Sequence, residues 1–299
     1  MSMLIVGSVA TDTVKTPFGK REDVLGGSAT FSSISASFFT TPHIVAVVGQ
    51  DFPVKYLSIF KGRDIGTEGL EIAKGKTFHW EGYYDYDLNT AHTVHTHLNV
   101  FKDFNPKIPR HLRNSRFVFL ANIDPDLQYN VLKQMRRPKL VACDSMNYWI
   151  TNKRKSLERL LDKIDIFLLN DSEARLFSGE PNLLKAARRI VSHGPKAVII
   201  KKGEHGVIYF SRSSHFVAPA YLLEYIYDPT GAGDTFAGGM IGFLSKASRI
   251  NDASMRKAII HGSILASFVV EDFSVNRLLD ISLGDIRARY KQFRRITKF

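Results

Sequence analysis

The sequence predicts an α/β fold, in which helices cover both faces of a central, mostly parallel sheet and a small β-sheet forms a lid. Apolar runs of strand length alternate with helical patterns, which is typical of parallel sheets. Two aromatic segments interrupt this order with strand-like alternation. Because no repeat or low-complexity linker is present, we expect one domain over residues 1–299, with a discontinuous lid formed by about 11–24 and 76–100.

The strands of the main sheet are predicted in chain order. MLIVGSV, at residues 3–9, is the first buried strand, a small-residue helix follows over 27–39, and HIVAVVG is the next strand. Pro53 favours the first position of the helix after it. Four further strand-length runs, separated by helical stretches, are RFVFLAN, KLVACD, DIFLLN and KAVIIKKG.

Each of these four runs ends in a polar residue or a glycine. Open parallel sheets bind ligands beyond the carboxyl ends of their strands. The polar residues at those ends are therefore candidate site residues on geometry alone, namely Asn122, Asp144, Asn170 and Lys202.

The second lid segment, FHWEGYYDYD, alternates as a strand does. Phe78, Trp80, Tyr84 and Tyr86 should share one face, where they could stack on a nucleobase or bury against a second subunit. His95 and His97 also share a face, so a metal site is conceivable. No Cys or Glu stands at a suitable spacing, and we interpret them as polar lid surface.

The composition of the chain limits the classes of function that it can have. The net charge of +12 is dispersed and accompanies no nucleic-acid-binding motif, so it indicates a solvated surface with a weak attraction for anions. The apolar runs are far shorter than the roughly 20 residues that span a bilayer, and the N-terminus lacks a signal-peptide pattern. One cysteine, Cys143, fits a reducing compartment. We expect a cytoplasmic protein that binds neither nucleic acid nor membrane.

The segment DPTGAGDTFAGG, residues 228–239, carries the clearest chemistry. We expect the strand YIYD, then a glycine turn, then a helix whose first N–H groups, on Ala232, Gly233 and Asp234, attract an anion. Gly231 and Gly233 let a phosphate approach the backbone. Asp234 should stay ionised at neutral pH and accept a hydroxyl proton. The Walker A alternative fails, because GKT at 75–77 lacks the upstream glycine and the following helix.

This segment resembles the C-terminal signature of the ribokinase-like, or PfkB, family of carbohydrate and nucleoside kinases. LGGSATF, with Gly26 and Gly27, matches the family's N-terminal glycine pair, and Asn170 to Glu173 match its N-x-x-E motif. The resemblance covers nearly the whole chain. It implies a ribokinase-like fold and a kinase that uses ATP and Mg²⁺, with a monovalent cation as a further candidate, to phosphorylate a hydroxyl of a sugar or nucleoside.

The resemblance also implies roles for matched residues. Asp234 resembles the catalytic base, and the backbone from Gly231 through Ala232 and Gly233 resembles the anion hole. Asn170 and Glu173 resemble the pair that positions Mg²⁺ through water. Asp12, at the end of the first strand, resembles the acid that binds substrate hydroxyls, with Gly26 and Gly27 near the sugar. The nucleotide-binding turn and adenine helix are matched by Lys202, Gly203, Gly206, His261, Ser263 and Ile264.

Three positions depart from the commonest family pattern or extend it. Thr30 stands where an asparagine often contacts the sugar, and Asn122 replaces a common glutamate or glutamine. Asn147 is a further candidate for facing the acceptor. Asp12 could instead cap a turn, and Asn122 or Asn147 could satisfy loop backbone.

Several functional alternatives stay open. The acceptor is a sugar or a nucleoside; a phosphosugar is the weaker alternative, for which Lys15, Lys20 and Arg21 could hold the phosphate or simply be solvated. A non-catalytic sugar- or nucleotide-binding regulator on the same fold, or a nucleic-acid-binding protein, is the alternative to a kinase. A homodimer could form through the β lid.

Overall fold

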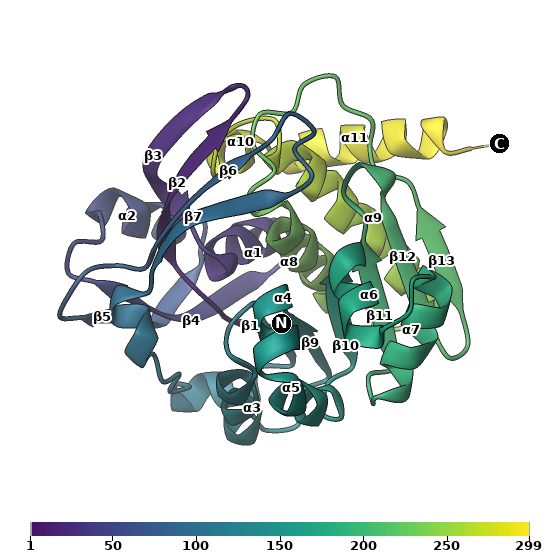
Figure 1. The fold of residues 1–299 in the computed structure, drawn as a ribbon, viewed down its shortest axis with the longest axis horizontal. Coiled ribbons are helices and arrows are strands. Elements are labelled where there is room, and N and C mark those ends of the chain that lie inside the picture. Colours follow the sequence, from purple (N-terminus) through teal and green to yellow (C-terminus); the bar gives the residue numbers. More distant parts are fainter. Residues whose placement is uncertain (1, 299) are drawn as a thin grey trace.

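A computed structural model describes residues 2–298 and contains two sheets (Figure 1). In spatial order, the strands of the large sheet are β13 (His215–Ala218), β12 (Val207–Ser211), β11 (Ala197–Lys201), β10 (Ile166–Asn170), β9 (Leu140–Asp144), β8 (Phe117–Leu120), β1 (Ser2–Val6), β4 (Thr41–Gly49) and β5 (Gly66–Ala73). The strands of the small sheet are β3 (Gly19–Gly26), β2 (Ala10–Thr16), β6 (His79–Tyr84) and β7 (Ala91–His97).

The large sheet is parallel from β5 to β11, and only β12 and β13 are added antiparallel at one edge. The six strands expected from apolar runs are all present. The strands β5, β12 and β13 were not expected. β5 and β13 are the edge strands and β12 lies next to β13, and each contains residues that are partly or fully exposed, unlike the buried parallel strands of the sheet centre.

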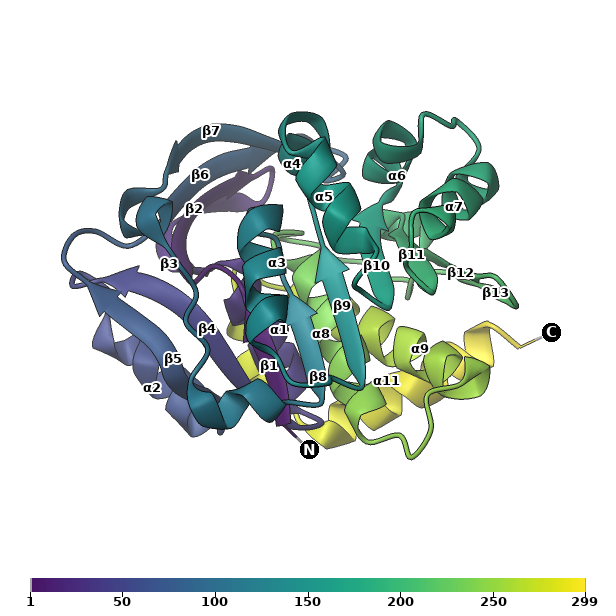
Figure 2. The same ribbon diagram turned by 90° about the horizontal axis from the view of Figure 1, so that it is seen from below.

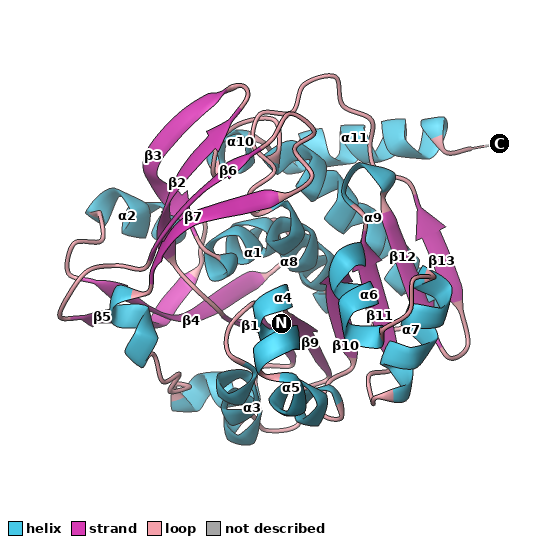
Figure 3. Cartoon of the chain, viewed as in Figure 1, coloured by secondary structure: helices cyan, strands magenta, loops and turns pink. Residues whose placement is uncertain are grey.

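Helices cover both faces of the large sheet, as Figures 2 and 3 show. One layer consists of α1 (Ser28–Ser37), α2 (Val54–Gly62), α8 (Ala232–Ser245), α9 (Asp252–Val269), α10 (Asn276–Asp280) and α11 (Leu283–Ile296). The other consists of α3 (Pro125–Gln134), α4 (Asn147–Asn152), α5 (Arg154–Leu161), α6 (Asp171–Ser178) and α7 (Leu183–Ser192), with the 3-10 helices η1 (Asn99–Asp103) and η2 (Arg110–Asn114). The short 3-10 helix η3 (Gly203–His205) joins β11 to β12.

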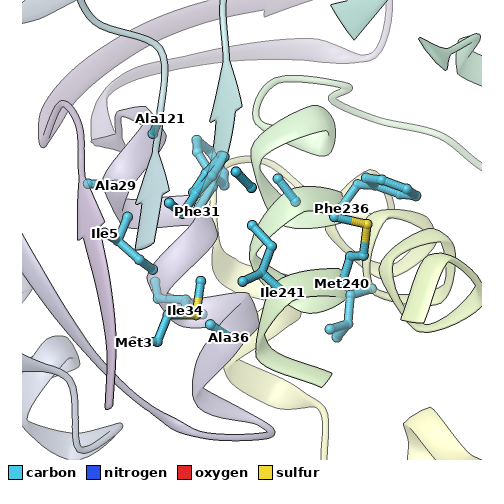
Figure 4. Close-up of a cluster of buried hydrophobic side chains, with 14 of the residues drawn as sticks. Met3, Ile5, Ala29, Phe31, Ile34, Ala36, Ala121, Phe236, Met240 and Ile241 are labelled. Atoms are coloured by element: carbon cyan, nitrogen blue, oxygen red, sulfur yellow. The ribbon is translucent and has the colours of Figure 1, made fainter. Parts of the chain in front are cut away.

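The core is divided by the large sheet into two apolar clusters. Alternate residues of β1 point to opposite faces, so Met3 and Ile5 join one cluster while Leu4 and Val6 join the other. All four side chains are fully buried. Figure 4 shows the first cluster, where β1 meets α1 and α8.

The helices α1 and α8 pack closely because α8 presents a glycine to α1. A β-carbon on Gly238 would lie 2.0 Å from the carbonyl oxygen of Ser32. At the start of α8, Gly231 has a left-handed φ of 74°, and a β-carbon there would lie 2.4 Å from the ring of Phe31. These contacts fix the position of the α8 N-terminus, on which the site described below depends.

The small sheet occupies 10–26 and 79–97, close to the two segments expected to form the lid. The strands β2 and β6 pair in parallel, and the two outer pairs are antiparallel. In Figure 2 this sheet lies on the side toward which the arrows of β8 and β9 point. His97 stacks between His79 and His95, with ring centroids 6.2 and 5.8 Å apart.

Three local expectations were wrong. Residues 225–228 form no strand, because the N–H of Tyr227 donates to Val270 O after α9 instead of to a neighbouring strand (2.8 Å). Pro53 caps α2 rather than starting it. Asp12 lies within β2, not at the end of the first strand, because the chain leaves the large sheet after Val6.

No helix within residues 2–298 combines the length and the apolar character needed to cross a membrane.

Candidate active site

The polar strand ends of the large sheet meet at one edge, as expected. Asp144 ends β9, Asn170 ends β10 and Lys201 ends β11, and Asn170 pairs with Lys201 in the sheet register. The Nζ atom of Lys201 lies 2.6 Å from Oδ2 of Asp144. Both side chains are largely buried, so this ion pair lies within the site and not on its rim.

The glycine turn places the N-terminus of α8 against these strand ends. Gly231 is the N-cap, and no side chain caps the helix there. Within residues 2–298 the N–H groups of Gly231, Gly233 and Asp234 have no hydrogen-bond acceptor, whereas that of Ala232 donates to Pro229 O at 3.1 Å. The free amides and the positive end of the helix dipole favour an anion at this point.

Burial changes the protonation of the site carboxylates. Loss of solvation, and next the charge of Asp144, raise the pKa of Asp234 to about 7, although Lys201 partly offsets them. Asp234 was expected to stay fully ionised at neutral pH, because the helix dipole was weighed without this burial. A group with this pKa can exchange protons near neutrality.

Asp12 reaches the same site from the small sheet. It is 5% exposed, and burial, followed by the charges of Asp228 and Asp234, raises its pKa to about 8. The hydroxyl of Tyr84, on β6, lies 3.3 Å from the hydroxyl of Thr230 in the glycine turn. These contacts bring the small sheet to the N-terminus of α8.

Gly26 and Gly27 are required by the protein's own packing. A β-carbon on Gly26 would lie 1.9 Å from Oδ2 of Asp12, and one on Gly27 would lie 2.5 Å from Ser8 O. Gly27 also has φ of 95°, a conformation that side chains disfavour. Gly26 therefore makes room for the Asp12 carboxylate, and Gly27 makes room for the backbone at Ser8.

Asn170 and Glu173 form a capping box at the start of α6. Oδ1 of Asn170 accepts the N–H of Glu173 at 2.8 Å, and Oε2 of Glu173 accepts the N–H of Asn170 at 2.7 Å. Glu173 is 8% exposed, and burial raises its pKa to about 7. The N-x-x-E pattern thus has a local structural cause as well as a possible metal role.

Asn170 and Glu173 suit a Mg²⁺ ion that keeps its water ligands better than an ion bound by protein side chains alone. Within residues 2–298, no group of three or more His, Cys, Asp or Glu side chains could hold a metal alone. Mg²⁺ usually keeps several waters and takes one or two carboxylates together with substrate phosphates. Glu173 offers its second carboxylate oxygen, which has no hydrogen-bond partner within the described chain, and its charge acts on Lys201.

The nucleotide-binding candidates fall into two places. Lys202, Gly203 and Gly206 form the β11–β12 connection, in which the N–H of Lys202 donates to Gly206 O at 2.8 Å. On α9, Ser263 is half-buried and Ile264 is fully buried in the core.

His261 is engaged elsewhere. Its ring stacks on Phe243 and Tyr290, with centroids 3.8 and 4.9 Å apart, and its Nδ1 lies 2.7 Å from Lys257 O. Residues two apart on a helix point in different directions, so the structure separates His261 from Ser263.

The acceptor candidates differ in exposure. Thr30 is fully buried in α1, and its hydroxyl oxygen has no partner among the described residues. Asn122 is half-buried just after β8, and its Oδ1 accepts the indole N–H of Trp149 at 3.0 Å. Asn147 is exposed at the first position of α4.

Lys201 was not among the candidates predicted from sequence, and Tyr84 was expected only as one of the aromatic residues of the lid. Lys202 was predicted as the polar end of the strand KAVIIKKG and was matched, with Gly203, to the nucleotide-binding turn; Lys201 was not considered. Successive strand residues point to opposite sides, so only one of the two lysines can face the site. The structure gives that place to Lys201.

Residues 11–281 match the family described as pfkB family carbohydrate kinase. The chain belongs to this family. The pfkB match spans the small sheet, the glycine turn and the Asp144–Lys201 pair. Membership makes the chain a phosphotransferase that acts on a hydroxyl group.

The sequence identity to three individual relatives lies between 16% and 27%. The chain is 27% identical to a cytidine kinase of Thermococcus kodakarensis over 84% of this chain and 91% of the relative. Among solved structures, the nucleoside kinase of Methanocaldococcus jannaschii superposes with a TM-score of 0.78 at 20% identity, covering 97% of this chain and 98% of the other. The E. coli protein classed as ribokinase II, solved with ATP and Mg²⁺, superposes with a TM-score of 0.80 at 16% identity over 97% and 99% of the two chains.

Proposed function

We propose that this pfkB-family kinase transfers the γ-phosphoryl group of ATP to a hydroxyl of a nucleoside, with Asp234 as general base. The observation that supports the reaction is the position of Asp234 in the first turn of α8, beside amides that lack an acceptor. The cytidine kinase relative, which aligns with most of both chains, favours a nucleoside over a free sugar. The ribokinase II neighbour, solved with ATP and Mg²⁺, favours that donor and ion.

Individual residues of the chain have distinct roles in this reaction. Asp12, which burial keeps protonated near neutral pH, can both donate to and accept from the hydroxyls of the acceptor. Asp234 takes the proton of the attacking hydroxyl. The amides of Gly233 and Asp234 offset the negative charge on the transferred group. Bound Mg²⁺ would neutralise the donor phosphates, and Glu173 would hold it through water.

The small sheet would close over this site. Asp12 and Tyr84 already reach the glycine turn from β2 and β6, so closure would exclude water from the transfer. We propose that the small sheet and the large sheet together form one kinase domain. A monovalent cation is a further requirement that we propose, and replacing K⁺ with tetramethylammonium in the assay tests it.

A homodimer through the small sheet is a separate proposal. Apolar side chains are exposed in or beside its strands, namely Phe18, Tyr86, Val94 and Leu98. Light scattering of the purified protein tests it, and a monomeric mass at micromolar concentration would argue against it. The buried Cys143, the only cysteine, supports a reducing compartment such as the cytoplasm.

The reaction is tested by ADP release with a panel of nucleosides, pentoses, hexoses and phosphosugars, with and without Mg²⁺. We expect a nucleoside to give the highest kcat/KM and Mg²⁺ removal to abolish turnover. Asp234→Asn should reduce kcat for that nucleoside by about 100-fold or more. Wild-type turnover by the Asn variant would refute the role of Asp234, and a preference for a hexose would refute the nucleoside assignment.

A further inference from the structure

We propose that Lys201 is a further catalytic residue, whose ammonium group binds the transferred phosphoryl group beside the amides of Gly233 and Asp234. This assignment rests on the kinase reaction proposed above. It adds a fixed side-chain cation to an anion site that the glycine turn otherwise builds from backbone alone.

The position of the ammonium group carries the proposal. A β-carbon on Gly233 would lie 3.0 Å from Nζ of Lys201, so the cation lies against the first turn of α8. The N–H groups of Gly233 and Asp234 have no acceptor among residues 2–298. Two kinds of donor therefore converge on one small volume, namely the ammonium group and the free amides at the N-terminus of α8. A phosphoryl group held by those amides would lie next to Nζ.

Lys201 also has unused hydrogen-bonding capacity. An ammonium group carries three N–H donors. In the described part of the chain, the Asp144 carboxylate is the one acceptor within hydrogen-bond distance of Nζ, at 2.6 Å. The lysine side chain is only 18% exposed. Buried charged donors without acceptors are costly, so the free donors point to a ligand that carries several acceptor oxygens.

The charges around Lys201 make this cation necessary. Its neighbours include three buried or part-buried carboxyl groups, on Asp144, Glu173 and Asp234. Burial lowers the pKa of Lys201, but the charges of Asp144 and Glu173 outweigh it and keep the lysine protonated. Without a cation, a phosphate entering among these acids would be repelled.

Asp144 is a positioning residue for this lysine. Its Oδ1 accepts the N–H of Ser145 at 2.9 Å, and its Oδ2 accepts Nζ of Lys201. Both carboxylate oxygens are thus fixed by contacts on opposite sides. The pair holds the ammonium group in place before substrate arrives, so little reorganisation is needed during transfer.

The transfer of the phosphoryl group requires no proton from Lys201. The bond from the γ-phosphorus to the β–γ bridging oxygen breaks, and its electron pair leaves with ADP. A new bond forms between that phosphorus and the acceptor oxygen, whose proton passes to Asp234. Lys201 stays protonated throughout and offsets charge on the non-bridging oxygens of the transferred group.

The test compares Lys201→Met and Lys201→Arg with the control Lys196→Met. Lys196 precedes the same strand, pairs with Asp165 at 2.7 Å, and is 81% exposed at the opposite end. We expect Lys201→Met to lower kcat by about 100-fold and Lys201→Arg to recover part of it, while Lys196→Met keeps the wild-type kcat. Calorimetry should show that Lys201→Met weakens a non-hydrolysable ATP analogue more than it weakens ADP. A kcat within a few-fold of wild type, or equal weakening of both nucleotides, would overturn the proposal.

If Lys201→Met does not fold, chemical labelling of the wild-type enzyme tests the contact between Lys201 and the phosphoryl group. Reductive methylation of Lys201, followed by mass spectrometry, should be slowed more by the ATP analogue than by ADP, with Lys196 as internal control. Equal labelling of Lys201 with both nucleotides would contradict the contact. This measurement needs no acceptor, so a wrong acceptor class in the reaction proposed above would not affect it.

Discussion

The indole N–H of Trp149, on α4, donates to Oδ1 of Asn122 at the end of β8, at 3.0 Å. An indole N–H can only donate, so the contact fixes which end of the Asn122 amide is the oxygen. The NH₂ group of Asn122 has no acceptor among residues 2–298 and is left to donate to a ligand. Asn122 is therefore suited to bind a substrate that presents a hydrogen-bond acceptor, such as a carbonyl oxygen, a ring nitrogen or a hydroxyl oxygen.

Trp149→Phe should weaken acceptor binding. The variant replaces the indole by a smaller aromatic ring and loses the hydrogen bond that orients Asn122, a loss of about 1 kcal/mol. We expect KM for the acceptor to rise roughly 5-fold while kcat changes little. Initial rates over a range of acceptor concentrations give both constants.

Tyr148→Phe is the matched control for Trp149→Phe. It removes one hydroxyl from the neighbouring ring, which is 56% exposed and contacts Trp149 edge-on. This variant should keep the wild-type KM. An unchanged KM in Trp149→Phe would show that the orientation of Asn122 does not affect the acceptor.

The activity should depend on pH through Asp234. Burial and the charge of Asp144 raise its pKa to about 7, so the carboxyl group becomes protonated as the pH falls through that value. A protonated base cannot accept the acceptor's proton, and kcat/KM should fall about tenfold per pH unit below 7. Rates between pH 5 and 9 measure this. Rates of Asp234→Asn should be low and lack this slope, and a flat wild-type profile down to pH 5 would exclude Asp234 as the titrating group.

Asp12 should destabilise the folded protein at alkaline pH. Burial, Asp228 and Asp234 raise its pKa to about 8, so the native state retains a proton that the unfolded chain releases near pH 4. The stability contribution of this group is complete below pH 4 and is lost as the pH rises to 8. Asp12→Asn stays neutral and should be more stable than wild type at pH 8.5 by at least about 1.4 kcal/mol, the value of one pKa unit.

Denaturant unfolding of Asp12→Asn at pH 4 and pH 8.5 checks this sign. The difference from wild type should shrink toward pH 4. Asp23→Asn, on the edge strand β3, is the control, because it changes a carboxylate that is 80% exposed. A variant that is less stable than wild type at pH 8.5 would show that the Asp12 carboxylate is not strained by burial.

Much of this site could be predicted because strand ends and glycine turns follow local rules. Asp144 and Asn170 were found from the polar ends of apolar runs, and the α8 N-terminus from GAGD between a turn and a helix. Which of two adjacent side chains enters a site depends on where the strand meets its neighbours, so the apolar run indicated Lys202 and did not reveal Lys201. The sequence alone does not contain that register.

Other errors have tertiary causes. Asp12 was assigned to the end of the first strand although it also falls in the predicted lid segment 11–24, because the sequence does not show to which sheet the chain belongs at that point. The aromatic neighbours of His261, namely Phe243 and Tyr290, come from other helices and were not expected. The raised pKa of Asp234 follows from burial by several segments. Such contacts join residues that lie far apart in the chain, and no local pattern reports them.

The close contact of α1 with α8 should make Gly238 intolerant of a side chain. A β-carbon would lie 2.0 Å from Ser32 O, so Gly238→Ala must push the two helices apart. We expect a loss of about 1–3 kcal/mol in the free energy of unfolding and a lower kcat, because the N-terminus of α8 would move with the helix. Gly62→Ala, in α2, is the control: a β-carbon there meets no atom within 4 Å, and it should be neutral or slightly stabilising. Equal stability of the two alanine variants in urea unfolding would show that this contact does not hold the site in place.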